Sequence, residues 1–192
     1  MAHHGKGHVA LYNTESGYAL RGVENQPAVR GLATIDRRTA AALLARSMLL
    51  GAYLGFERFY QYAWDNGRMG MLTSDGRTET DSLRAYASVR RWLRGTTLLG
   101  CRMQPGRFVK CEGERAGRHL SIAWKPTGGA AVMLPIGGGA GDPDAEHAID
   151  GPLRSEPGAA GNRFVTVGSV PVAWWTRSTG AANRADANRR KD

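Results

Sequence analysis

The sequence predicts a protein of two parts, an α/β part followed by an all-β part. A strand-like segment, a long helical segment and a second strand-like segment follow one another over residues 9–64, which is the order of a βαβ unit. A second helical pattern covers about residues 80–94. Near Thr96 the apolar period changes from 3.6 to 2 residues, and short strand-like runs then alternate with turns, as in an antiparallel sandwich.

Two strands are predicted in the α/β part. Residues 9–15 are apolar on both faces, which is typical of a strand covered on both sides of a sheet, with Asn13 and Glu15 on the same face. Residues 56–64 form the second buried strand, which ends at Trp64. Because parallel strands present their carboxyl ends at one edge of a sheet, Glu15 and Trp64 are expected to lie at a common rim.

A long helix is predicted between these strands. Asp36 is its expected N-cap, and Ile35 and Ala40 are placed to form a hydrophobic staple. Alanine-rich helical spacing continues to Gly51 or Gly55, where the helix is expected to end.

The second helix is predicted over about residues 80–94. Tyr86, Val89 and Leu93 are expected to form its inner stripe. Gly95 suits the left-handed position that follows a helix.

The all-β part is predicted to begin at residue 97. Its strand-like runs are residues 97–103, 108–114, 119–124, 130–134, 164–167 and 170–175. The glycine-rich residues 136–162 are expected to form a long loop, and the polar end of the chain a disordered tail. The predicted domains are therefore residues 1–96, 97–176 and 177–192.

Two cysteines, Cys101 and Cys111, flank a turn-like stretch between two predicted strands. Their spacing allows a bridge across neighbouring strands, which would imply an oxidising compartment. Two buried free thiols are the other interpretation, and the sequence leaves both open. Two cysteines alone do not predict a metal site.

Composition and charge exclude several classes of protein. The chain of 192 residues is 42% hydrophobic and 22% charged, as in ordinary globular proteins. Its net charge of +9 is spread along the chain without an aromatic-interleaved basic stripe, so no nucleic-acid partner is expected. No apolar run approaches the ~20 residues that cross a bilayer, so no membrane partner is expected either.

Glu15 and Trp64 suggest chemistry on sugars, because hydrolysis needs a carboxylate and sugar rings stack on aromatic platforms. Asn13, Tyr62 or His8 can supply the polar neighbours that an attacking carboxylate needs. The alternative is that both residues have purely structural roles: Glu15 caps the next turn, and Trp64 is a core residue.

Three further residues lie just beyond the predicted strand ends. Tyr18 follows the first strand, and Asp65 and Asn66 follow the second. Side chains at such a rim are expected to hydrogen-bond sugar hydroxyls. Neither a metal nor a cofactor is expected.

Three ordered motifs resemble the end of a clan A glycoside hydrolase, of the family 39-like and family 5-like (β/α)₈ enzymes. They are residues 13–18 (NTESGY), 45–47 (ARS) and 57–66 (ERFYQYAWDN). The resemblance spans roughly residues 5–95. It implies that Glu15 ends strand seven as the catalytic nucleophile and that Trp64 ends strand eight as the sugar-stacking residue.

The resemblance implies the last two βα units of a (β/α)₈ barrel followed by an antiparallel β-sandwich. The family's acid/base glutamate ends strand four, upstream of anything in this sequence. We therefore expect a C-terminal fragment of a retaining glycoside hydrolase, acting on a polysaccharide or oligosaccharide and inactive alone. Its expected partners are a carbohydrate substrate and the missing N-terminal barrel portion. Relatives of this type are commonly bacterial and often secreted or periplasmic, although the residues leave the compartment open.

The alternative is a noncatalytic carbohydrate-binding or interaction protein built on the sandwich. Trp124, Trp174 and Trp175 can form a sugar-binding patch on its strands. Strand alternation nevertheless favours core packing for at least two of them.

Overall fold

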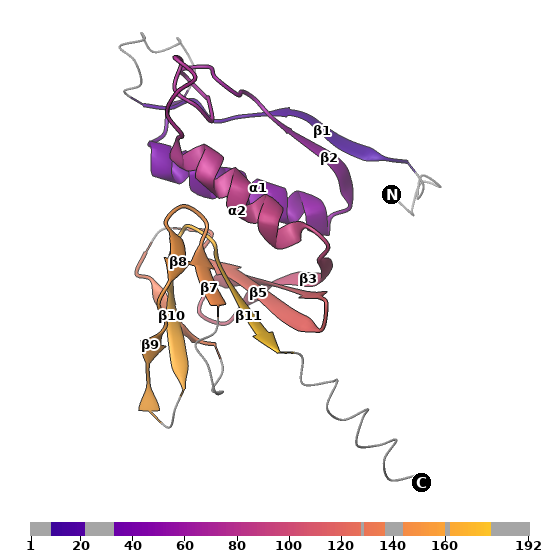
Figure 1. Ribbon diagram of the computed structural model, residues 1–192, viewed down its shortest axis with the longest axis vertical. Coiled ribbons are helices and arrows are strands. Elements are labelled where there is room, and N and C mark those ends of the chain that lie inside the picture. The colour runs from indigo at the N-terminus through magenta and orange to yellow at the C-terminus, as the bar shows by residue number, and fades with distance from the viewer. Residues whose placement is uncertain (1–8, 22–32, 128, 137–143, 160–161, 178–192) are drawn as a thin grey trace. The chain divides into compact units, whose positions relative to one another are not determined.

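The computed structural model has two compact units, Met1–Val89 and Arg90–Asp192, which we describe separately (Figure 1). It describes residues 9–21, 33–127, 129–136, 144–159 and 162–177. The predicted disordered tail beyond Arg177 lies outside the described residues.

The first unit contains the predicted strand–helix–strand order. Its elements are β1 (Leu11–Ser16), α1 (Arg37–Tyr53), β2 (Phe56–Gln61) and most of α2 (Asp81–Leu93). β1 and β2 pair in parallel, with Leu11 opposite Phe56 and Ser16 opposite Gln61. Both helices lie on the same side of this pair (Figure 1). The parallel pairing that the βαβ prediction requires is therefore present.

The prediction that these strands are buried was wrong. No residue of β1 or β2 is buried, and Tyr12 and Tyr60 are 49% and 48% exposed. The reason is that the described sheet has only two strands and carries its helices on one side. Phe56 and Phe59 both lie next to Gly51 of α1 and are the better covered side chains.

The predicted alternation in β1 is also broken. Register irregularities fall between Leu11 and Tyr12 and between Asn13 and Ser16. As a result Asn13 is half-buried whereas Glu15 is exposed, although the sequence placed them on the same face. An inserted residue of this kind re-aims the side chains that follow it.

Helix α1 begins and ends as predicted. The Asp36 carboxylate accepts hydrogen bonds from the backbone N–H of Thr39 at 2.9 Å and from its hydroxyl at 2.6 Å. Ile35 and Ala40 belong to one apolar cluster, as a hydrophobic staple requires. Gly55, with φ of 80°, follows the end of the helix.

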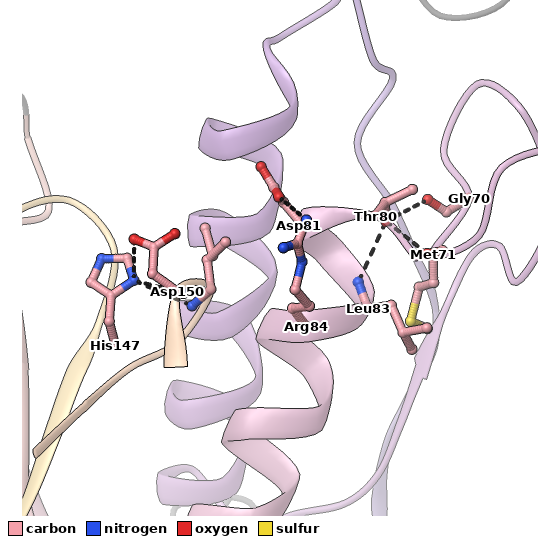
Figure 2. A network of polar contacts seen from close by, with 9 residues as sticks. Gly70, Met71, Thr80, Asp81, Leu83, Arg84, His147 and Asp150 are labelled. Atoms are coloured by element: carbon pink, nitrogen blue, oxygen red, sulfur yellow. Dashed lines mark hydrogen bonds and ion pairs between the residues drawn. The ribbon is translucent and has the colours of Figure 1, made fainter. Parts of the chain in front are cut away.

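Thr80 immediately precedes helix α2 and ties it to the preceding loop (Figure 2). The Thr80 hydroxyl donates to the Met71 carbonyl at 2.7 Å and accepts from the Leu83 N–H at 3.4 Å. Gly95 has φ of 69°, as predicted for the residue after the helix.

The predicted inner stripe of α2 was only partly correct. Val89 is buried, but Tyr86 and Leu93 are only partly buried. The buried positions of the helix are Ser82, Ala85, Ser88, Val89 and Trp92. Small and hydroxyl side chains fill much of this stripe, so an apolar pattern does not reveal it.

The second unit is a sandwich of a six-stranded and a three-stranded sheet. Its strands are β3 (Thr97–Gln104), β4 (Phe108–Arg115), β5 (Arg118–Trp124), β6 (Val132–Pro135), β7 (Asp144–His147), β8 (Gly151–Leu153), β9 (Glu156–Pro157), β10 (Arg163–Val167) and β11 (Val172–Arg177). The sheet orders are β3-β4-β5-β11-β7-β8 and β6-β10-β9, and all pairings are antiparallel. One core cluster joins residues of both sheets, including Val165 and Trp174. The predicted antiparallel sandwich is confirmed.

The predicted loop over residues 136–162 was wrong in part, because β7, β8 and β9 lie within it. In the six-stranded sheet, β7 lies between β11 and β8 and pairs with both. His147 at its end accepts from the backbone N–H groups of Ile149 and Asp150, which closes the turn to β8. Figure 2 shows His147 and Asp150 in contact.

The two cysteines form a disulfide bond. Cys101 and Cys111 face each other directly in the β3–β4 ladder, and their Cα atoms are 4.0 Å apart. Of the two interpretations of these residues, the structure has the cross-strand bridge.

Candidate functional site

The carboxyl ends of β1 and β2 meet at one edge of the parallel pair. The backbone N–H of Tyr62 donates to the Ser16 carbonyl at 2.7 Å. Glu15 immediately precedes one partner of this bond, and Trp64 follows the other by two residues. The two segments that carry the predicted site residues therefore lie side by side at this edge.

Glu15 is exposed at the end of β1. Within the described residues, no side chain forms a hydrogen bond or ion pair with its carboxylate. Asn13 and Tyr62, which were expected to supply such contacts, do not do so, and His8 lies outside the described residues. The carboxylate is thus open to a ligand, and Glu15 does not cap the following turn.

Trp64 presents its indole to solvent on a fixed backbone. It is 56% exposed, and the neighbouring Tyr62 is 45% exposed. The carbonyls of Ala63 and Trp64 accept hydrogen bonds from the N–H groups of Met71 and Leu72 at 3.1 and 2.8 Å. Trp64 is therefore not a core residue, and its position suits a stacking platform.

The remaining rim residues differ in availability. The Tyr18 hydroxyl is 3.0 Å from the Ser47 hydroxyl of α1, so it is already engaged. Asn66 Oδ1 accepts from the Arg68 N–H at 2.8 Å and shapes the turn after β2. Asp65 is exposed. The structure therefore leaves Asp65 open to a ligand and gives Tyr18 and Asn66 internal contacts.

The rim is held together by close backbone contacts. A Cβ atom on Gly17 would overlap the Tyr62 carbonyl oxygen. One on Gly70 would overlap the backbone of the same loop. The Leu20 N–H donates to the Arg68 carbonyl at 2.8 Å, which joins the segment after β1 to the loop after β2.

Two polar residues beside the site were missed by sequence reasoning. Ser16 Oγ and Gln61 Oε1 are buried without a hydrogen-bond partner among the described residues. They occupy opposite positions in the ladder, and the Gln61 amide nitrogen donates to the Tyr62 carbonyl at 3.0 Å. In the sequence, only their positions next to Glu15 and Tyr62 could have indicated that Ser16 and Gln61 lie beside the site.

On the exposed side of the β1–β2 pair, the Arg58 guanidinium lies close to two tyrosine side chains. Arg58 donates to the Tyr60 hydroxyl at 3.2 Å, and its guanidinium carbon is 5.7 Å from the centre of the Tyr12 ring. The hydrogen bond to Tyr60 raises the pKa of Arg58 because it stabilises the charged form. On α1, burial lowers the pKa of Arg46, which lies near Tyr18.

Within the described ranges, no group of three or more His, Cys, Asp or Glu side chains is arranged to hold a metal ion. No helix in the same ranges is both long and apolar enough to cross a membrane.

The fold matches the C-terminal portion of solved clan A glycoside hydrolases. A family 39 glycoside hydrolase from the gut symbiont Bacteroides cellulosilyticus WH2 aligns with 88% of this chain, with a TM-score of 0.64 and 16% identity. A GH30 endoxylanase from Clostridium papyrosolvens C71 also aligns with 88%, with a TM-score of 0.59 and 13% identity. The GH30 subfamily 8 xylanase Xyn30A from Clostridium acetobutylicum aligns with 88% of this chain as well, with a TM-score of 0.58 and 10% identity.

The matches cover only part of each of the three solved proteins. The chain spans only 34% to 42% of the length of the three proteins. No protein-family model and no curated protein sequence matches it. The comparisons therefore confirm the resemblance at the level of fold, including the sandwich after the α/β part.

Proposed function

We propose that this chain is the C-terminal portion of a retaining glycoside hydrolase, that it provides the last two βα units of the barrel, and that Glu15 is the nucleophile. The observation that carries the proposal is the backbone bond between Tyr62 and Ser16, which joins the carboxyl ends of two parallel strands. It brings an exposed carboxylate and an exposed indole to one edge. The fold likeness to clan A hydrolases supports the same assignment.

The proposed chemistry needs a second carboxyl group. In a retaining hydrolase the nucleophile attacks the anomeric carbon while an acid about 5–5.5 Å away protonates the leaving oxygen. Water then releases the sugar from the carboxylate, with the second group acting as base. Glu15 takes the first role, and the second belongs to a glutamate on a strand outside these 192 residues. The isolated chain is therefore proposed to be inactive.

The proposed substrate contacts follow the exposure of the rim. Trp64 stacks against the apolar face of a sugar, and the Tyr62 hydroxyl and Asp65 bind its hydroxyl groups. Asn13, Tyr18 and Asn66 shape the rim. Because two of the matched proteins are named xylanases, xylan and xylo-oligosaccharides are the first substrates to test.

The first experiment compares this chain with a longer product that includes in-frame barrel sequence upstream of Met1. We expect xylan and aryl xylosides to be hydrolysed only by the longer protein. Glu15→Gln should lower its kcat by about 10⁴-fold or more, as expected for loss of a nucleophile. Glu57→Gln, which changes another exposed carboxylate of the same sheet, is the matched control and should retain activity.

Two outcomes would contradict the proposal. Full activity of the Glu15→Gln variant in the longer protein would remove the nucleophile assignment. Turnover by the pure 192-residue chain, abolished by Glu15→Gln, would show that the proton donor lies within this sequence.

The alternative of a sugar-stacking patch on the sandwich is not supported. Trp124 and Trp174 are only 1% and 4% exposed and belong to the interior. Trp175 is partly exposed, but the guanidinium carbons of Arg115 and Arg118 lie 4.3 and 5.5 Å from its ring centre. Core packing of two of the three tryptophans, as the sequence favoured, is confirmed.

A further inference from the structure

Three arginines form a row across the larger sheet of the second unit. Arg118 on β5 lies directly opposite Arg115 on β4 and directly opposite Arg177 on β11. Paired residues share a face, and neighbouring strands are about 4.8 Å apart, so three positive charges lie side by side. Like charges in such positions repel one another, and the row therefore lowers stability unless anions lie against it.

The row is held in place around Trp175. Arg115 and Arg118 lie against its ring, at the distances given above. Arg115 also donates to the carbonyls of Arg91 and Arg94 at the end of α2, both at 3.0 Å. Arg177 is two residues beyond Trp175 on the same strand face. These contacts pre-organise the guanidinium groups of Arg115 and Arg118 at the end of the sheet.

The carboxylates at this end only partly balance the arginines. Asp144 pairs with Arg118 at 2.7 Å and is 72% exposed, and Glu146 is bound by Arg91 and by the Trp92 indole. Among the described residues named here, the five arginines Arg91, Arg94, Arg115, Arg118 and Arg177 outnumber the two carboxylates by three. Arg177 is exposed, and no ion pair to it is formed within the described residues.

We propose that this arginine row binds a carboxylated polysaccharide, one that carries uronate groups. The planar guanidinium fork matches a carboxylate with two parallel hydrogen bonds, and a row of such forks suits a repeating series of carboxylates. The choice of a polysaccharide among polyanions rests on the proposed function, but the arginine row belongs to the second unit and Glu15 to the first.

The aromatic side chains argue against single-stranded nucleic acid as the ligand. Such strands bind by stacking bases on exposed rings. Among the described residues of this unit, the large exposed apolar side chains are Leu99, Met103 and Met133, none of them aromatic. The ring of Trp175 is already in contact with two guanidinium groups.

The experiment measures binding of the whole chain to polygalacturonate by calorimetry and affinity electrophoresis. We expect saturable binding that weakens about tenfold or more when ionic strength rises from about 20 to 200 mM, because exposed charges are screened. Fully methyl-esterified pectin should not bind. Dextran sulfate and an oligothymidylate should bind more weakly than polygalacturonate.

Charge-neutral variants locate the site. Arg177→Gln should weaken binding about three- to tenfold, the usual effect of one exposed charge-assisted hydrogen bond, and Arg118→Gln with Arg177→Gln should weaken it further. Arg102→Gln is the matched control, because exposed Arg102 pairs with Lys110 and faces the opposite side of the same sheet. It should change binding by less than about twofold.

Several results would overturn the proposal. These are equal binding of the esterified polymer, equal effects of Arg177→Gln and Arg102→Gln, and tighter binding of the oligothymidylate or of dextran sulfate. If the double variant does not fold, Arg177→Gln alone decides. Binding does not require hydrolysis, so failure of the hydrolysis experiment would not contradict binding of polygalacturonate. Failure of polygalacturonate binding would likewise not contradict the role proposed for Glu15.

Discussion

Gly17 separates the proposed nucleophile from the remainder of the rim. Because it has no side chain, the backbone after β1 can pass directly against the Tyr62 carbonyl. The sequence showed a glycine that turns the chain away from Glu15. It could not show that a neighbouring strand fills the space that a side chain would need, since this depends on the pairing of β1 with β2.

Gly17→Ala should therefore destabilise the first unit. The added methyl overlaps a backbone atom that cannot rotate away, and overpacking of this kind costs about 1–3 kcal/mol. Thermal unfolding followed by circular dichroism measures the change. Gly100→Ala is the control, because no atom lies within 4 Å of the place its methyl group would occupy, and it should change stability by less than about 0.5 kcal/mol. Equal stability of the two variants would contradict the close contact.

Asp36 illustrates a prediction from sequence that the side-chain contacts confirm. Hydrogen bonds from the Thr39 hydroxyl and N–H hold the pKa of Asp36 below its ordinary value of 3.8. A lowered pKa in the folded state stabilises the fold fully above pH 3.8. That stabilisation is lost as the pH falls through the lower, folded-state value.

Asp36→Ala should lower stability by about 1 kcal/mol at about pH 7, the usual cost of losing an N-cap. The difference from the unchanged protein should shrink as the pH falls below 3.8. Asp36→Asn keeps a capping oxygen, so it should lose only a few tenths of a kcal/mol. Urea unfolding at a series of pH values measures both. A constant difference for Asp36→Ala between about pH 7 and about pH 3 would rule out this role.

At the level of elements, strands with apolar alternation were predicted and strands without it were missed. β7 is built from Asp144, Ala145, Glu146 and His147, and offers no apolar pattern. Asp144 and Glu146 form ion pairs with Arg118 and Arg91, and Glu146 also accepts a hydrogen bond from the Trp92 indole N–H. These partners lie far away in the sequence. The irregular register in β1 and the serine-lined stripe of α2 were not predicted from the sequence for the same reason. Each depends on partners that no local pattern contains.

The β3–β4 bridge is an element-scale feature with a direct test. Mass spectrometry after alkylation without reductant should find neither Cys101 nor Cys111 modified. Replacing both by alanine should cost about 2–3 kcal/mol, because the bridge closes a loop of about ten residues in the unfolded chain. Two alkylated thiols in protein purified from an oxidising compartment would restore the free-thiol interpretation.

At the scale of the whole molecule, an important feature is that the described residues of the first unit leave one side of the β1–β2 pair without helices. Parallel sheets are normally covered on both faces, yet Tyr12, Tyr60, Tyr62 and Trp64 are all about half exposed. The edges of the pair are also free to accept another strand within the described part of the first unit. The remaining barrel units in the proposed hydrolase would cover both. On that proposal, the strand direction is correct in this chain, whereas burial of the strands requires the other barrel units.

Such a surface should make the isolated chain self-associate. We expect sedimentation velocity to show a concentration-dependent rise in mass, because apolar rings and open strand edges are buried when copies meet. Replacing Tyr12 and Tyr60 by threonine keeps a residue suited to strands and should reduce the association. Tyr53→Gln, which alters a 44% exposed tyrosine at the end of α1, is the matched control and should leave it unchanged. Exposed strand edges and apolar patches normally associate at about 100 μM. If the chain stays monomeric at that concentration, this side of the sheet needs no partner.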